Sequence, residues 1–565
     1  MKALITKPFL SLTGVIVLNL IFGSICLAQT DTYKKQVADL QSSGAVWIPD
    51  QGDGNYTNPI IDADYSDPDA IRVGDDYYMT ASSFSHFPGL PILHSKDLVN
   101  WEIIGYAAKN YPYKTFDKPQ HGNGIWAPSI RYHKGMYYIY YGDPDYGIFM
   151  TKAKNPTGPW EPLRLIREAK GWINCCPLWD DDGNTYLVHA WANSRSGIKS
   201  IITVNKMSAD GEKILDDGTM VFDAHVNHPT MEGPKFYKRN GYYYIFAQAG
   251  GVKPGWQTVL RSKNIYGPFE DKIVLEQGST KINGPHQGAW VTTQTDEDWF
   301  LHFQNRYAFG RIVHLEPMKW VNDWPVIGED HDKNGIGEPV EKYKKPNVGK
   351  DINLVKVPQT NDEFDSKNLG LQWQWQANPK PGWISLTENK GWLRFNSQVM
   401  GNDDKNLRDS PSLLMQKFPA RQFSATTLLE LNSKQVGEKA GLIIFGMDYS
   451  YIGIVKKDSS YALVQNVCNN ADRGNPEAEI FTAGIQVNKI YLRVSVKQDL
   501  SDNGIPQALC SFSFSFNGQA FIPFGKEFKA REGKWVGAKV GIFTYAPKNS
   551  AKVGYTDFDW FRFTK

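Results

Sequence analysis

The sequence has little cysteine and no excess of either charge. Its 565 residues include 5 cysteines, without a CxxC pair or a zinc-site spacing, so neither a metal cage nor cysteine catalysis is indicated. A bridge between the neighbours Cys175 and Cys176 would be strained, and Cys468 and Cys510 could pair only on adjacent strands. The 62 basic and 60 acidic side chains give a net charge of +2 without long runs of one sign. This balance argues against nucleic acid or an anionic membrane as a partner.

Helical periodicity and long apolar runs are nearly absent as well. The exception is an apolar run over residues 9–27, which follows two lysines and ends at Ala28. This pattern predicts a secretory signal peptide over residues 1–28, cleaved after Ala28. One alternative is an uncleaved membrane anchor, but the polar segment that follows the apolar run lacks a basic stop-transfer cluster. The other is a lipid on Cys26, which the bulky Ile25 before it disfavours. We therefore expect a periplasmic or secreted protein without a membrane segment after cleavage.

What the sequence has instead is a repeated turn followed by an aromatic–aliphatic strand. The repeats align on Tyr78, Tyr138, Tyr186, Tyr244 and Phe300, with steps of 60, 48, 58 and 56 residues. A period near 50 residues built from short strands is typical of a β-propeller. Five repeats predict five blades, whose strands converge on one axis and bring distant residues into one pocket.

The composition divides the chain into regions. We expect a polar lead-in over residues 29–54, a five-bladed catalytic propeller over 55–345 and a linker over 346–360. Residues 361–565 alternate apolar and polar side chains in short runs, which predicts an antiparallel β-sandwich. The predicted fold class is all-β, with the propeller first and a concanavalin-like sandwich (a jelly roll) second.

Polar residues precede three of the repeated strands, where a propeller points side chains at its axis. Asp67 lies in the run 64–69, Glu232 in 230–235 and His286 in 283–290. Each run taken alone could be an ordinary turn. Two carboxyl groups across a pocket are the apparatus of glycoside hydrolysis, in which one donates a proton and the other activates water or attacks carbon. Their environments must then hold their pKa values apart.

Several ordered motifs together resemble a known family. They are Ser66–Ile71 with Tyr77-Tyr78, Pro91–Trp101, Ile125–Ser129, Glu232–Pro234, His286–Trp290, Gly310-Arg311 and Asp362–Trp375. This set is similar to glycoside hydrolase family 43. The resemblance implies a five-bladed propeller that hydrolyses with inversion. It also implies the concanavalin-like sandwich of β-xylosidase and α-L-arabinofuranosidase members.

The resemblance also implies roles for individual residues. Asp67 would be the general base that activates water, and Glu232 the general acid. Arg311 would lie near the sugar and the acid. His286 matches a histidine at the axis that holds a calcium ion in some members; a structural hydrogen-bonded histidine is the alternative. We expect no other cofactor.

Two aromatic residues are candidates for the pocket wall. Trp126 lies in the Ile125–Ser129 motif, and Phe84 follows the first repeated strand. Aromatic rings suit a sugar, which has an apolar face and a polar edge. Packing in the propeller core is the alternative for both side chains.

One position departs from the family pattern. Relatives carry an aspartate ahead of the turn that here reads Asp180–Gly183, and this chain has Asn174 in its place. The family aspartate orients the acid and raises its pKa. An amide can still bond sugar hydroxyls but lacks the negative charge.

The sequence therefore predicts a secreted exo-acting hydrolase that removes terminal α-L-arabinofuranosyl units from arabinose- or xylose-containing plant polysaccharides. A β-D-xylosidase is the close alternative, because the two sugars present similar hydroxyl groups. A weakly active or non-catalytic sugar-binding propeller is a further alternative that Asn174 favours and the intact Asp67 and Glu232 oppose. A fructan-cleaving propeller would carry Asn-Asp-Pro, whereas this chain has Ser66-Asp67-Pro68.

Overall fold

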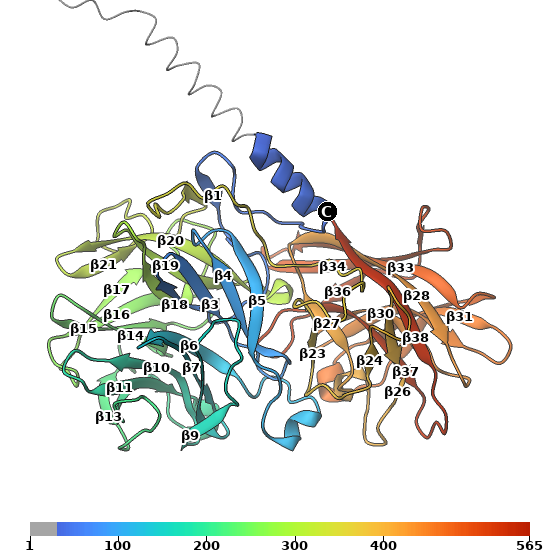
Figure 1. Cartoon of the computed structure of the whole chain (residues 1–565), viewed down its shortest axis with the longest axis horizontal. Coiled ribbons are helices and arrows are strands. Elements are labelled where there is room, and N and C mark those ends of the chain that lie inside the picture. The colour runs from blue at the N-terminus through green and yellow to red at the C-terminus, as the bar shows by residue number, and fades with distance from the viewer. Residues whose placement is uncertain (1–30) are drawn as a thin grey trace, which may run out of the picture.

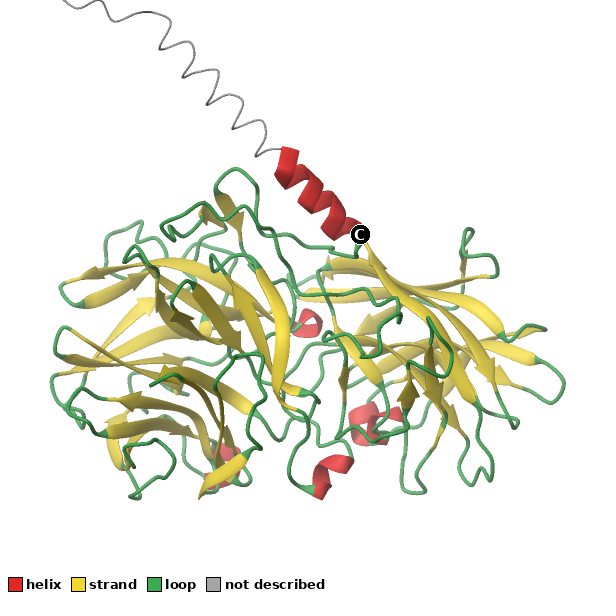
Figure 2. Ribbon diagram, in the orientation of Figure 1, coloured by secondary structure: helices red, strands yellow, loops and turns green. Residues whose placement is uncertain are grey.

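The computed structural model describes residues 31–565 and confirms the all-β prediction. A propeller and a β-sandwich lie side by side, and residues 31–42 form a helix at their junction (Figure 1). Strands dominate both domains, and the other helices are single turns (Figure 2). The predicted signal peptide lies outside the described residues.

The propeller consists of five antiparallel sheets, each with four strands in sequence order. The first blade is β2 (Asp69–Val73), β3 (Asp76–Thr80), β4 (Gly89–Ser95) and β5 (Trp101–Ala108); the second is β6 (Trp126–His133), β7 (Met136–Asp143), β8 (Gly147–Ala153) and β9 (Arg164–Glu168); the third is β10 (Trp172–Trp179), β11 (Thr185–Trp191), β12 (Ile201–Met207) and β13 (Thr219–Asp223); the fourth is β14 (Glu232–Arg239), β15 (Tyr242–Ala249), β16 (Trp256–Ser262) and β17 (Glu270–Leu275); the fifth is β18 (His286–Thr292), β19 (Asp298–Asn305), β20 (Arg311–Val321) and β21 (Trp324–Ile327).

The repeated aromatic position lies on the second strand of every blade. Gly135 and Gly241 have φ of 82° and 74° at the turns before β7 and β15, a conformation that costs glycine little and favours tight hairpins. The aligned ring residues are Tyr78, Tyr138, Tyr186, Tyr244 and Phe300, all buried. The aromatic repeat in the sequence therefore marks the same structural position in each blade.

Short pairings close the ring between the last blade and the first. The strand β1 (Asn55–Thr57) pairs with β22 (Lys342–Lys344). Ile61 and Val313 exchange backbone hydrogen bonds of 3.3 and 3.0 Å. The segment before the first blade is thereby held against β20, which places residues 62–67 at the junction of blades and sandwich.

The sandwich has two eight-stranded sheets around an apolar core. Cys468 and Cys510 lie on strands of different sheets and are free and buried, so these cysteines do not meet the condition for pairing. One sheet has β23 (Gln374–Trp375), β26 (Gln398–Val399), β27 (Leu414–Lys417), β29 (Lys439–Phe445), β30 (Tyr449–Lys456), β31 (Tyr461–Cys468), β32 (Ala478–Ile485) and β37 (Lys539–Ala546); the other has β24 (Ile384–Ser385), β25 (Leu393–Asn396), β28 (Gln422–Asn432), β33 (Lys489–Leu500), β34 (Pro506–Ser515), β35 (Ile522–Pro523), β36 (Phe528–Ala530) and β38 (Tyr555–Thr564).

The two domains share backbone hydrogen bonds and a partly buried ion pair. Phe87 of the propeller and Trp375 of the sandwich exchange backbone bonds of 2.9 and 2.7 Å. Arg421 Nε lies 3.0 Å from Asp62 Oδ2. Burial raises the pKa of Asp62, and the Arg421 guanidinium opposes that rise. Loss of Arg421 would leave the buried Asp62 carboxylate without its partner, so the pair favours this docking of the domains.

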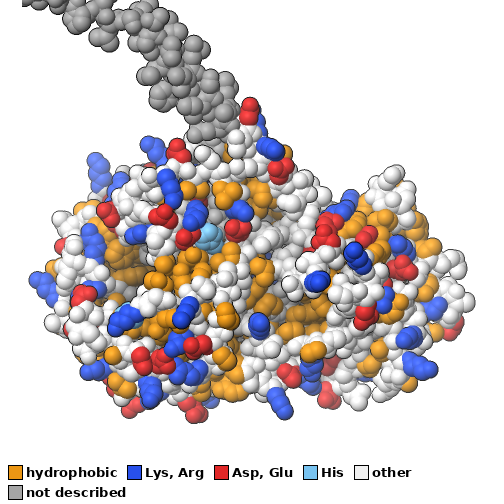
Figure 3. Space-filling model, in the orientation of Figure 1, with side chains coloured by type: hydrophobic (Ala, Val, Ile, Leu, Met, Phe, Trp, Pro, Cys, Tyr) orange, Lys and Arg blue, Asp and Glu red, His pale blue; other side chains and the backbone are white. Residues whose placement is uncertain are grey.

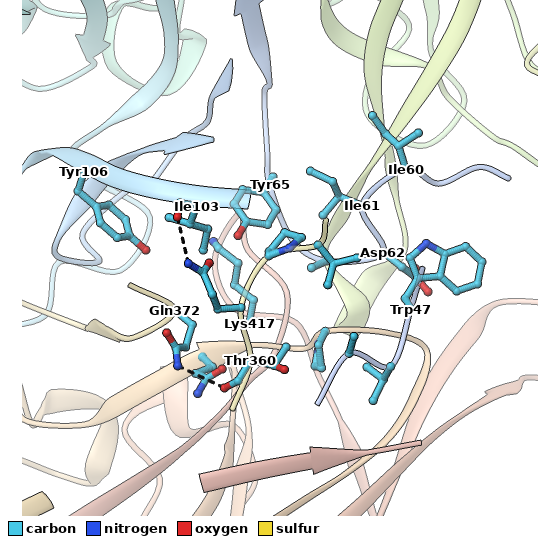
Figure 4. A pocket seen from close by; sticks show the side chains of 18 residues that line it. Trp47, Ile60, Ile61, Asp62, Tyr65, Ile103, Tyr106, Thr360, Gln372 and Lys417 are labelled. Atoms are coloured by element: carbon cyan, nitrogen blue, oxygen red, sulfur yellow. Dashed lines mark hydrogen bonds between the residues drawn. The ribbon is translucent and has the colours of Figure 1, made fainter. Parts of the chain in front are cut away.

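A cavity of about 50 Å³ lies at this junction (Figure 4). Its lining comes from the N-terminal segment, the propeller and the sandwich, and includes Trp47, Asp62, Tyr65, Tyr106 and Lys417. The lining contains neither Asp67 nor Glu232, so the cavity is separate from the predicted site.

The visible face of the molecule mixes charges of both signs with apolar side chains (Figure 3). Such interspersed charge agrees with the near-zero net charge of the sequence. Within residues 31–565, no helix has the length and apolar character needed to cross a membrane.

Candidate active site

The backbone takes a left-handed conformation where each inner strand begins. Non-glycine residues with this conformation are uncommon, and they cluster at functional sites. Strand irregularities accompany the turn in the second to fifth blades. The five positions are Asp67 (φ 56°), Ala127 (36°), Asn174 (56°), Gly233 (64°) and Gln287 (35°). The same backbone conformation therefore recurs in all five blades and directs side chains toward the propeller axis.

Asp67 is shielded from solvent and held by several donors. Its side chain is 5% exposed. The hydroxyls of Ser66 and Ser82 donate to Oδ2 at 2.8 and 2.5 Å, and Arg311 Nη1 lies 3.3 Å from Oδ1. Ser82 also accepts the backbone N–H of Ala127 at 2.7 Å, which ties the carboxylate to the second blade. Asp67 thus has a fixed orientation and a positive partner.

Arg311 begins β20 and connects the two sides of the site. Its Nη1 donates to Ser66 Oγ at 2.7 Å, and its guanidinium lies 4.9 Å from the Phe303 ring. The Phe303 ring in turn lies 5.4 Å from His286. The direct carboxylate partner of Arg311 is therefore Asp67, and Phe303 links it to the opposite side.

Glu232 differs from Asp67 in its surroundings. Its side chain is 35% exposed, and its Oε1 lies 3.2 Å from His286 Nε2. His286 is fully buried, and its Nδ1 finds no hydrogen-bond partner in residues 31–565. The site thus holds one shielded carboxylate and one open to solvent.

The residues around His286 are a poor match for calcium, which takes six to eight oxygen ligands. Over the described part of the chain, no three His, Cys, Asp or Glu residues come together as a metal site. The carboxylate next to His286 is Glu232, the predicted acid. The calcium ion remains a prediction from the family resemblance, and no step below depends on it.

Asn174 lies at the left-handed position of β10, beside β14, which carries Glu232. The side chain is buried, and its Oδ1 has no hydrogen-bond partner among residues 31–565. A buried amide oxygen without a donor carries a free-energy cost, and a bound hydroxyl would satisfy it. Asn174, the position that departs from the family pattern, therefore presents an unsatisfied hydrogen-bond acceptor at the axis.

The aromatic wall combines residues of both domains. Phe84 and Trp126 pack edge to face at 6.2 Å. Trp535, from the sandwich loop between β36 and β37, lies 6.1 Å from Trp126 and 6.0 Å from the Arg311 guanidinium. Its side chain is 41% exposed. Trp535 was not predicted from the sequence, because this tryptophan follows an irregular Gly- and Lys-containing run without a strand pattern.

Beneath the carboxylates, a buried charged cluster fills the axis. Arg131 Nη1 lies 2.7 Å from Asp69 Oδ2, and Lys235 Nζ donates to Ser129 Oγ at 2.9 Å. Although burial lowers the pKa of Arg131, the Asp69 carboxylate raises it above the usual value. The cluster joins the first, second and fourth blades, so it holds the inner strands in place under the pocket.

One shielded and one exposed carboxyl group on the inner strands of a propeller, beside aromatic side chains, are the arrangement expected of a glycoside hydrolase. Two family profiles match the chain: glycosyl hydrolases family 43 over residues 56–325, and the beta xylosidase C-terminal concanavalin A-like domain over residues 361–564. The chain therefore belongs to glycosyl hydrolase family 43.

Similar proteins carry two kinds of name. A putative beta-xylosidase of Xylanibacter ruminicola is 40% identical over 496 residues, which cover 88% of this chain and 87% of that protein. A non-reducing end alpha-L-arabinofuranosidase of Bacteroides ovatus is 30% identical over 428 residues, with coverages of 71% and 75%. The structure of a xylan beta-1,4-xylosidase from Bacillus halodurans has a TM-score of 0.77 at 25% identity, covering 90% of this chain and 100% of that one.

Replacing either carboxyl group should abolish most of the turnover. We expect Asp67→Asn and Glu232→Gln each to lower kcat at least about a hundredfold on an unactivated disaccharide, the usual weight of one positioned acid or base. Circular dichroism should show an unchanged fold. A near-parental kcat in either variant would show that the replaced residue is not the catalytic acid or base.

Removing the sandwich tryptophan should weaken substrate binding. Trp535→Ala deletes the ring that lies beside Trp126 and Arg311, so KM should rise about twofold to tenfold, in line with about 0.5–1.5 kcal/mol for a lost aromatic contact. Trp535→Phe serves as the matched control and should keep most of the affinity. An unchanged KM in Trp535→Ala would place the ring outside the binding surface.

Proposed function

We propose that this protein is an exo-acting hydrolase that removes single terminal pentosyl units, β-D-xylosyl or α-L-arabinofuranosyl, with inversion. The observation that carries the proposal is the pairing of a shielded Asp67 with an exposed Glu232, which the contacts of Arg311, Phe303 and His286 connect. Trp535 of the second domain lies 6.1 Å from Trp126. A sandwich loop placed beside the propeller site in this way suits one terminal sugar rather than the interior of a chain.

Asp67 acts as the general base in this proposal. The two serine hydroxyls and Arg311 hold the carboxylate in one orientation, so its remaining lone pairs can accept a proton from a water molecule. The water oxygen then bonds to the anomeric carbon from the face opposite to the leaving group, which inverts the configuration.

Glu232 acts as the general acid. It gives its proton to the glycosidic oxygen while the bond between that oxygen and the anomeric carbon breaks. His286 Nε2, 3.2 Å from Oε1, orients the carboxyl group. The exposure of Glu232 allows the leaving alcohol to depart and allows a proton to return from solvent for the next cycle.

The identity of the sugar is the finer part of the proposal. The sequence favours an arabinofuranosyl unit first, whereas the relatives at 40% and 34% identity are named beta-xylosidases. A pocket that recognises the hydroxyl pattern shared by the two pentoses would serve both. Plant polysaccharides carry both sugars, and the predicted signal peptide supports action outside the cytoplasm.

A sugar-binding propeller without catalysis is the second candidate, and Asn174 is the observation that favours it. Its unsatisfied Oδ1 could accept a sugar hydroxyl without helping proton transfer. The two functions differ in product release, so one kinetic experiment separates them.

We expect the protein to release 4-nitrophenol from both 4-nitrophenyl β-D-xyloside and α-L-arabinofuranoside, and to release a single pentose from short oligosaccharides. The Asp67→Asn variant is the blank for contaminating hydrolases. Binding of the pentose in calorimetry without turnover on either glycoside or on the oligosaccharides would favour the non-catalytic function.

The Asn174→Asp variant tests the missing charge. A nearby carboxylate disfavours ionisation of a second one, so Glu232 should keep its proton to a higher pH in the variant. The alkaline limb of the profile of kcat against pH should therefore move to higher pH, and the acidic limb should stay in place. Asn174→Ala removes the amide without adding charge and is the control. An alkaline limb that stays or moves downward in Asn174→Asp would contradict a charge role for this position.

A further inference from the structure

Three cationic side chains near the candidate site each lie over an aromatic ring. Cations over ring faces are attracted by the negative face of the aromatic system. The pairs are Arg195 with Trp126 at 5.8 Å, Lys534 with Trp535 at 4.5 Å and Lys253 with Tyr307 at 4.2 Å. Two of these rings, those of Trp126 and Trp535, belong to the aromatic wall described above.

The first two pairs share one supporting loop. Trp126 Nε1 donates to the backbone carbonyl of Gly122 at 2.8 Å, and Arg195 Nη2 donates to Asn123 Oδ1 at 2.8 Å. Lys534, from the sandwich, packs closely against this loop. A Cβ added to Gly122 would stand 2.4 Å from the Lys534 Cγ. Both cations therefore lie at the rim around Trp126.

The third pair continues the rim on the other side of Trp535. Tyr307 precedes Ala308, whose carbonyl accepts the N–H of Ala538 at 2.8 Å in the loop that follows Trp535. Lys253 lies two residues before Gly255, where an added Cβ would stand 3.1 Å from His286 Nδ1. The arc of rings and cations thus runs from Trp126 to the Glu232 side of the site.

Among the described residues, the two lysines have no partner in an ion pair. Arg195 is paired with Asp145 at 2.9 Å. Lys253 and Lys534 are exposed, and neither makes an ion pair with any residue in the 31–565 range. Glu532, in the same loop as Lys534, forms no ion pair with either lysine. The rim therefore offers aromatic faces beside free positive charge.

We propose that this rim binds the leaving-group side of acidic oligosaccharides, with a uronic acid carboxylate placed at Lys253 or Lys534. A sugar ring presents an apolar face to Trp535 or Tyr307, and a uronic acid adds one carboxylate at its edge. A neutral saccharide uses the rings and leaves the lysines unpaired. This inference rests on the proposed function and specifies the class of substrate on which it acts.

The test compares a neutral xylo-oligosaccharide with one of equal length that bears a single glucuronosyl branch on the leaving-group side. At low ionic strength, about 0.01 M, kcat/KM should be about threefold to tenfold higher for the acidic substrate, as expected for one or two exposed charge pairs. At about 1 M salt the preference should vanish, because the charges are screened.

Charge-removing variants assign the effect to the two lysines. In the double variant Lys253→Met and Lys534→Met, the ratio of acidic to neutral kcat/KM should fall to about one at low salt, because methionine keeps the apolar stem. Lys350→Met, which removes an exposed lysine paired with Asp75, is the control and should keep the parental ratio.

Equal kcat/KM on both substrates at low salt, or a preference that survives in the double variant, would overturn the inference. Either result could occur while the neutral oligosaccharide is still cleaved, so the proposed function would stand. If the parent cleaves neither oligosaccharide and binds both, the proposed function itself fails.

Discussion

The Asp64 carboxylate holds the propeller and the sandwich together at the active site. Its Oδ1 accepts the backbone N–H of Arg311 at 2.8 Å, and its Oδ2 accepts that of Gly537 at 3.0 Å. The contact is so close that a Cβ on Gly310 would stand 2.4 Å from Asp64, and one on Gly537 would stand 2.7 Å from the backbone of Gly310. The loop that carries Trp535 is therefore fixed relative to the arginine that contacts Asp67.

Through this contact of Asp64, residues of both domains come together at the candidate site. The propeller alone supplies Asp67, Glu232 and the inner-strand turns that aim them at the axis. The sandwich adds Trp535 and with it one wall of the pocket. The two carboxyl groups differ in exposure, with 5% for the Asp67 side chain and 35% for that of Glu232.

Features that repeat along the chain, or that belong to family motifs, could be predicted from the sequence. The aromatic repeat identified all five blades, because it marks the second strand of each one. The left-handed turns were not readable, since Asp67, Ala127 and Asn174 have no residue type in common. Trp535 and the role of Asp64 were missed for a related reason. The contact of Asp64 with Gly537 spans 473 positions of sequence, and Trp535 contacts Trp126 and Arg311 of the other domain. Long-range contacts between irregular loops leave no periodic signal.

The central claim is that Asp67 activates water while Glu232 protonates the leaving group, and proton NMR of the first-formed sugar tests it most directly. Cleavage of a β-D-xylosyl substrate should yield α-xylose first, before mutarotation, because water attacks opposite to the departing oxygen. A first product with the configuration of the substrate would require a covalent intermediate and would contradict the assignment of Asp67 as a base.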